Sequence, residues 1–197
     1  MGSWGLLLPL AVLGAEPTLA PLPVDALDAY VVDGVTTTAY RLNSDAERYT
    51  LILSRTGNFS VAEGDERSAR LYATLFADNP DGHQQRWLIQ DRVDACPLDI
   101  TAEFTDTPAQ VSDADADGVP EFWVSYRTAC RGDVSPSTLK VIGYEGSQKY
   151  ALRGSSRLKL GDSSEGGDYE VDVAFKSAPL LQEYASKLWA AVRDEAF

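Results

Sequence analysis

Residues 71–89 read LYATLFADNPDGHQQRWLI, and this stretch decides the fold. Two runs of aliphatic and aromatic residues flank the segment DNPDGH, which contains the turn-forming pairs Asn-Pro and Asp-Gly. The pattern predicts an antiparallel hairpin from Leu71 to Ile89. It also places His83, the only histidine of the chain, in the turn of that hairpin.

Similar runs lie on both sides of this hairpin, with turn signals between them. They are TTTAYRL (36–42), RYTLILSR (48–55), PLDITAEF (97–104), EFWVSYRTA (121–129), TLKVIGYEGSQKYALRG (138–154) and YEVDVAF (169–175). After these runs the period changes: residues 178–195 follow a capping Ser177 and carry Leu181, Tyr184, Leu188 and Val192 at helical spacing. We therefore expect a mainly β fold (α+β), an antiparallel sheet of hairpins with a packed C-terminal α-helix.

The N-terminus and the charge indicate where the protein works. An apolar run from Trp4 to Leu13 is too short to span a bilayer, and small residues follow it, so residues 1–20 are predicted to be a signal peptide. Residues 21–197 then form one β-rich domain without a transmembrane span, in the periplasm or outside the cell. The net charge of −13 disfavours nucleic acid as a partner.

Cys96 and Cys130 are the two cysteines of the chain. In an oxidising compartment an isolated pair is most simply a disulfide. Such a bridge encloses the most acidic segment of the sequence. A catalytic thiol is the alternative, but His83 is the only histidine available as its base and lies in a predicted turn.

The enclosed segment, DADADGVPEFWV (113–124), has the spacing of a cation-binding loop. Side-chain oxygens at its first, third and fifth positions can converge on Ca²⁺, while a glycine at the sixth allows a sharp turn and a carbonyl at the seventh adds an oxygen. The predicted ligands are Asp113, Asp115, Asp117, the carbonyl of Val119, and Glu121. An EF-hand is excluded because its twelfth position is Val124 and a strand follows. The alternative is an acidic turn without an ion.

These residues carry two resemblances. The pattern D-x-D-x-D-G-x-P-E before an apolar strand resembles the calcium loops of FG-GAP and VCBS hairpins, although those loops usually have Asp at the ninth position. The longer stretch 113–154, with Cys130–Pro136 and Lys149–Gly154, resembles a family of secreted bacterial proteins associated with surface polysaccharide biosynthesis. This second resemblance implies a role in the cell envelope and no reaction mechanism.

The functional hypothesis is a calcium-binding, non-enzymatic envelope protein associated with surface polysaccharide or with another envelope protein. The alternative is an acidic periplasmic inhibitor or immunity-type protein that covers a cationic enzyme. No catalytic residue is assigned: a Ser-His-Asp triad would depend on His83, and a catalytic carboxylate pair depends on distances that the sequence does not give. The tripeptide Arg131-Gly132-Asp133 is too short to indicate adhesion.

Overall fold

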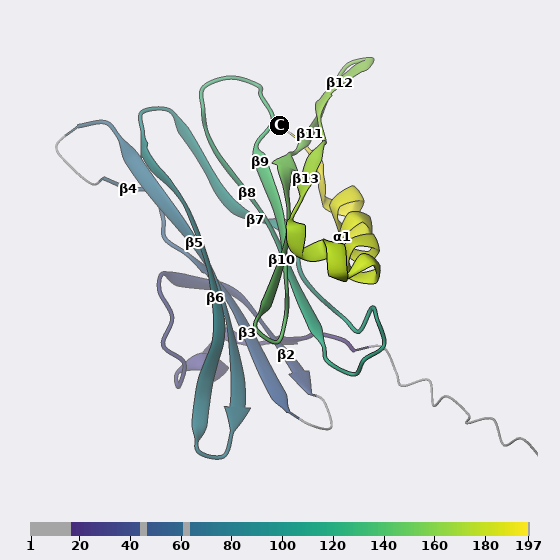
Figure 1. Ribbon diagram of the computed structural model, residues 1–197. Coiled ribbons are helices and arrows are strands. Elements are labelled where there is room, and N and C mark those ends of the chain that lie inside the picture. Colours follow the sequence, from purple (N-terminus) through teal and green to yellow (C-terminus); the bar gives the residue numbers. More distant parts are fainter. Residues whose placement is uncertain (1–16, 44–46, 61–63, 197) are drawn as a thin grey trace, which may run out of the picture.

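The computed structural model describes residues 17–43, 47–60 and 64–196. Two antiparallel β-sheets lie face to face, and the helix α1 (Pro179–Val192) covers the outer side of one of them (Figure 1). The predicted mainly β fold with a packed C-terminal helix is confirmed. The predicted signal peptide falls mostly on residues 1–16, outside the described residues, and Ala20 is the first residue of a strand.

The first sheet has six strands in the order β1-β2-β3-β5-β4, and β6 also pairs with β5. Its strands are β1 (Ala20–Leu22), β2 (Val35–Asn43), β3 (Arg48–Arg55), β4 (Phe59–Ser60), β5 (Arg67–Asn79) and β6 (Gly82–Cys96). The predicted hairpin is the pair β5–β6, in which Asn79 pairs with Gly82 across the turn. His83 follows that turn as the second residue of β6.

The second sheet has five strands in the order β13-β10-β9-β8-β7. Its strands are β7 (Asp99–Ser112), β8 (Glu121–Arg131), β9 (Thr138–Glu145), β10 (Gln148–Ser155) and β13 (Tyr169–Val171). The hairpin predicted within residues 138–154 is β9–β10. A small third sheet joins β11 (Arg157–Leu160), β12 (Ser163–Gly166) and β14 (Asp194–Glu195), and the hairpin β11–β12 projects beyond the two main sheets in Figure 1.

The main core lies between the two sheets, because alternate residues of each strand point to the same side. The first sheet contributes Leu51, Leu53, Leu71, Leu75, Trp87 and Ile89, and the second contributes Val111, Phe122, Val124, Tyr126, Ile142 and Ala151. Strand β8 is buried on both faces: Phe122 and Val124 belong to this core, whereas Trp123 packs with the residues of α1.

Each sheet is also covered on its outer face. On the second sheet, α1 buries Leu181, Ala185, Trp189 and Val192 against residues that include Trp123, Leu139 and Val141. On the first sheet, the 3₁₀ turn η1 (Val24–Leu27) places Leu27 against Ala39, Ile52 and Phe76. Both sheets therefore have buried residues on both faces.

The C-terminal elements differ from the prediction in their boundaries. The helix ends at Val192 rather than at residue 195, since Asp194–Glu195 leaves it to pair in parallel with β11. Ser177 does not cap the helix, because its hydroxyl donates to the carbonyl of Ala174 and the N-cap residue is Ala178. The run YEVDVAF is strand only to Val171. It then forms the 3₁₀ helix η2 (Val173–Ser177), where the Asp172 carboxylate accepts from the amide of Ala174.

Cys96 and Cys130 form a disulfide. Cys96 is the last residue of β6 in the first sheet, and Cys130 lies in β8 of the second. The bridge therefore joins the two sheets next to the point where the chain crosses from one to the other. Within the described residues, no helix has both the length and the apolar character that crossing a membrane requires.

Candidate functional site

The acidic loop connects β7 to β8, as the predicted strand-loop-strand arrangement requires. Ser112 and Glu121 form the last pair of the β7–β8 ladder, so the loop begins and ends at fixed positions. One more hydrogen bond fixes the base of the loop: the indole Nε1 of Trp123 donates to the hydroxyl oxygen of Ser112 at 2.9 Å. The loop thus stands on a buried polar base.

The aspartates of the loop accept hydrogen bonds from its own backbone. Asp113 accepts from the amide of Gly118 at 3.3 Å, Asp115 from Asp117 at 3.3 Å, and Asp117 from Val119 at 2.7 Å. Gly118 has a φ of +85°, in the left-handed region that glycine adopts most easily. The tight turn predicted at this glycine is present.

The carboxylates of this region fall into two groups that share Asp115. Oxygens of Asp113, Asp115 and Asp117 lie within 4.8 Å of one another, and so do oxygens of Asp115, Glu121 and Glu145. Glu145 is not among the residues predicted as ligands. It ends β9 and pairs with Glu121 across the β8–β9 ladder, so the sheet register, rather than the loop spacing, brings it to the site.

Glu121 is completely buried. Its carboxylate accepts from the hydroxyl of Ser112 and, at 3.0 to 3.1 Å, from the amide of Ala114. Burial raises the pKa of Glu121 above its ordinary value, and the nearby Asp115 charge acts in the same direction. This side chain therefore holds the start of the loop and brings a carboxylate to the second group.

The carboxylate of Glu145 is also partly withdrawn from solvent. Its Oε1 atom is buried and has no hydrogen-bond partner, whereas Oε2 accepts from the Tyr150 hydroxyl at 3.4 Å. Burial raises the pKa of Glu145, and the charges of Asp115 and Asp117 add to the effect. Two glutamates directly opposite each other on neighbouring strands repel when both are ionised. A cation bound between them would remove this repulsion and give the orphaned oxygen a partner.

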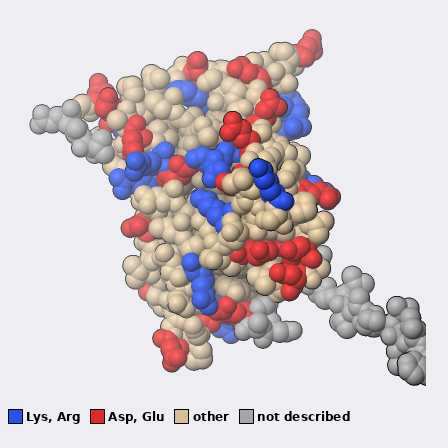
Figure 2. All heavy atoms as spheres, in the orientation of Figure 1, with Lys and Arg blue, Asp and Glu red and all other residues tan. Residues whose placement is uncertain are grey.

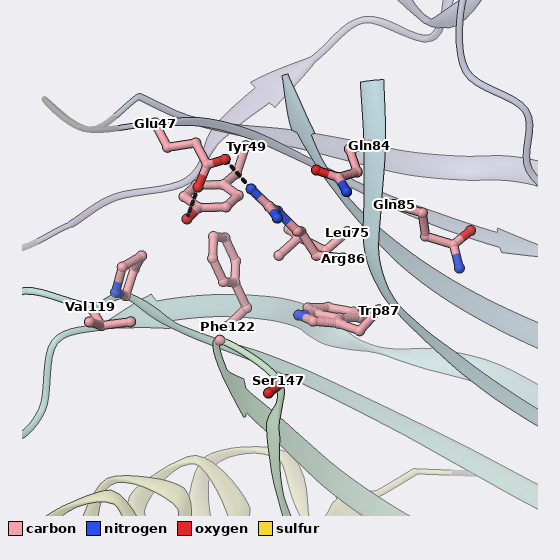
Figure 3. A pocket seen from close by; sticks show the side chains of 12 residues that line it. Glu47, Tyr49, Leu75, Gln84, Gln85, Arg86, Trp87, Val119, Phe122 and Ser147 are labelled. Carbon is pink, nitrogen blue, oxygen red and sulfur yellow. Dashed lines mark hydrogen bonds and ion pairs between the residues drawn. The ribbon is translucent and has the colours of Figure 1, made fainter. Parts of the chain in front are cut away.

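A cavity of about 510 Å³ lies beside the loop (Figure 3). It is on the face of the second sheet that points toward the first sheet, opposite to the face that α1 covers. Three aromatic residues line it: Tyr49 from β3, Trp87 from β6 and Phe122 from β8. The rest of its lining comes from Glu47, Leu75, Gln84, Gln85, Arg86, Val119, Pro120, Gly146 and Ser147. The acidic loop therefore contributes its last two residues, Val119 and Pro120, to the rim of the cavity.

A β-bulge in β6 aims Arg86 into the cavity. Leu75 pairs with Trp87 and Phe76 pairs with Gln85, so Arg86 is the extra residue of β6 at this point. An extra residue in one strand lets two consecutive side chains turn to the same side. Figure 3 accordingly shows the Trp87 ring between Arg86 and Ser147.

Among the described residues that line the cavity, Glu47 is the acidic one. It forms an ion pair with Arg86, and its Oε2 accepts from the Tyr49 hydroxyl at 2.6 Å. These two hydrogen bonds hold the pKa of Glu47 below its ordinary value, while burial and the Glu47 carboxylate raise the pKa of Tyr49 to about 12. At neutral pH the cavity therefore contains a carboxylate, a guanidinium and a neutral phenol.

Two other motifs of the sequence have structural contacts. The His83 ring stacks on Tyr30 at 4.0 Å, and its Nδ1 lies 2.8 Å from Asp78. In the Arg-Gly-Asp tripeptide, the Arg131 side chain is 12% exposed and pairs with Glu195 at 2.6 Å. The His83 and Arg131 side chains therefore each contact residues from other segments of the fold.

No family model, no curated protein and no solved structure matches this chain. The resemblances to FG-GAP and VCBS loops and to the surface-polysaccharide family stay predictions.

Proposed function

We propose that this protein is a calcium-binding, non-enzymatic envelope protein that binds polysaccharide in the cavity beside its acidic loop. The observation that carries the proposal is the lining of that cavity. The half-buried ring of Tyr49 offers apolar surface for the C–H face of a sugar, and the almost fully buried rings of Trp87 and Phe122 form the wall behind it. The amide of Gln84, which faces the cavity in Figure 3, offers both donors and an acceptor for the hydroxyl groups of the sugar.

Calcium has a separate role in this proposal. The two groups that share Asp115, one with Asp113 and Asp117 and the other with Glu121 and Glu145, offer carboxylate oxygens, which hard cations prefer. The buried oxygen of Glu145 that lacks a partner supports a cation at this place. Because Val119 and Pro120 lie on the same loop and line the cavity, an ion that orders the loop also fixes the cavity rim.

The disulfide supports the proposed location. Disulfides persist in the periplasm and outside the cell, where thiols are not kept reduced. The bridge between Cys96 and Cys130, together with the acidic composition, is consistent with a secreted or periplasmic protein.

Affinity electrophoresis through gels that contain isolated bacterial surface polysaccharide tests the proposal. The calcium-loaded protein should migrate more slowly in these gels than in plain gels. Replacing Gln84 with alanine should reduce this retardation, because Gln84 is exposed and its amide faces the cavity. Gln90→Ala is the matched control, since Gln90 is exposed on the same strand outside the cavity.

Equal migration of the wild-type protein in both kinds of gel would contradict polysaccharide binding. Recovery of one basic enzyme from envelope extracts, with an affinity that falls steeply as salt increases, would favour the inhibitor hypothesis instead.

A further inference from the structure

Basic residues gather next to the cavity although the protein is strongly acidic. Figure 2 shows lysine and arginine side chains along the middle of the face that carries β6 and β10. Lys140 of β9 and Lys149 and Arg153 of β10 lie near one another, because the charges of Lys140 and Arg153 act on Lys149. They point to the same side of the second sheet, because Lys140 pairs with Arg153 and Lys149 is four residues from Arg153 along β10.

Aromatic contacts connect this group to the cavity. Trp87, which lines the cavity, stacks on Tyr144 with ring centroids 4.8 Å apart and planes at 13°. The Nζ atom of Lys149 lies 5.9 Å from the centre of the Tyr144 ring. The Lys149 ammonium is thus one aromatic ring away from the cavity wall.

Two of the three basic residues have acidic partners. Lys140 pairs with Asp91 of β6, and Arg153 pairs with Asp172 at 3.1 Å. Lys149 is exposed, and among the described residues no carboxylate forms an ion pair with it. Partial desolvation of the Lys149 ammonium lowers its pKa, and the Arg153 and Lys140 charges act in the same direction, whereas the Asp172 and Asp91 charges oppose them. A bound anion would offset this repulsion.

We infer that the binding face extends from the cavity to Lys149 and that Lys149 binds a carboxylate of an acidic polysaccharide. The inference rests on the proposed function and narrows it to uronate-containing chains. One sugar ring occupies the cavity, where Tyr49 has the most accessible of the three aromatic rings, and an adjoining uronate places its carboxylate at Lys149. Lys140 and Arg153 add positive potential on the side away from the cavity.

The net charge of −13 does not prevent this binding. At physiological ionic strength the screening length is about 8 Å, so acidic residues on distant surfaces contribute little at Lys149. Near Lys149, Asp91 and Asp172 offset the charges of Lys140 and Arg153, so the Lys149 ammonium itself is the group that attracts a carboxylate. Raising the salt concentration should weaken binding only modestly, as one charge contact requires.

Titration calorimetry with a hyaluronan hexasaccharide and with its carboxyl methyl ester tests the inference on the calcium-loaded full chain. The two probes share one backbone and differ in charge. The acid should bind more tightly than the ester, and Lys149→Gln should weaken binding of the acid by about threefold to fivefold without changing binding of the ester. Lys176→Gln is the control, because Lys176 is an exposed lysine of η2 outside this group.

Three results would each overturn the inference. They are equal affinity for acid and ester, unchanged binding of the acid by the Lys149 variant, and no heat with either probe. The proposed function is decided separately by retardation in polysaccharide gels and by the Gln84 variant. If retardation in the gels persists but the acid and the ester bind alike, the cavity is a polysaccharide site and Lys149 makes no carboxylate contact.

Discussion

At the scale of single residues, Gly143 shows how closely the second sheet is packed. It pairs with Trp123 across β8 and β9, and a Cβ atom at this position would lie 2.3 Å from the indole ring. Trp123 is 1% exposed and packs against α1. A side chain at position 143 must therefore displace the indole from its buried position.

Gly143→Ala should therefore lower the free energy of unfolding by about 1 to 3 kcal/mol, the usual cost of overpacking a core. Urea unfolding followed by far-UV circular dichroism measures this change. Gly57→Ala is the control, because no atom lies within 4 Å of its added Cβ and its φ is not in the left-handed region. Equal stability of the two variants would show that the Trp123 ring is not fixed as described.

Glu145 shows where sequence reasoning stops at this scale. The spacing of Asp113, Asp115 and Asp117 along one loop is visible in the sequence, and the structure does bring these residues together. Glu145 lies beyond the loop, two strands away from its start, and only the pairing of β8 with β9 places it opposite Glu121. Local sequence patterns do not determine that register. The one sequence signal for Glu145 is its place at the end of a predicted strand.

At the scale of elements, the C-terminus is held by one carboxylate. Glu195 of β14 accepts from Arg131 at 2.6 Å, from the Ser137 hydroxyl at 2.8 Å and from the Ser156 hydroxyl. Burial opposes ionisation of Glu195, but the hydrogen bonds outweigh it and hold the pKa below the ordinary value of 4.5. The charged form of Glu195 is thus the form that the fold requires.

Glu195→Gln should lower the free energy of unfolding at neutral pH by about 1 to 3 kcal/mol, because charge-assisted hydrogen bonds are lost. A group with a lowered pKa stabilises the fold above its ordinary pKa of 4.5, and this stabilisation disappears as the pH falls through the lower folded value. The difference between wild type and variant should therefore shrink below pH 4.5. Urea unfolding at a series of pH values measures it, with Glu165→Gln in exposed β12 as the control. A difference that does not depend on pH would contradict this account of the C-terminal contact.

The disulfide also connects separate elements. It joins β6 of the first sheet to β8 of the second, and its cysteines are 34 residues apart in the sequence. Replacing both Cys96 and Cys130 with serine should cost about 3 to 4 kcal/mol, because the unfolded chain regains the entropy of an open loop. Guanidinium unfolding measures the loss, and the wild-type protein in reducing agent should match the variant. An unchanged midpoint in both would show that the bridge contributes nothing to stability.

At the scale of the whole molecule, the strands, both hairpins and the helix could be predicted, because alternation and turn residues are local signals. The stacking of two sheets could not. Alternation shows which residues of a strand share a face, but β3 and β8 are buried on both faces and read as continuous apolar runs. The cavity could not be predicted either, since Tyr49, Trp87 and Phe122 come from three strands in two sheets.

The central claim is that calcium binds the carboxylates around Asp115, and titration calorimetry of chelator-treated protein tests it most directly. Calcium should produce heat and raise the melting temperature of wild-type protein. Asp115→Asn should lose most of both effects, because Asp115 belongs to both carboxylate groups, whereas Asp162→Asn in the exposed β11–β12 turn should keep them. Absence of heat and of a thermal shift in the wild-type protein, or wild-type behaviour of the Asp115 variant, would contradict the claim.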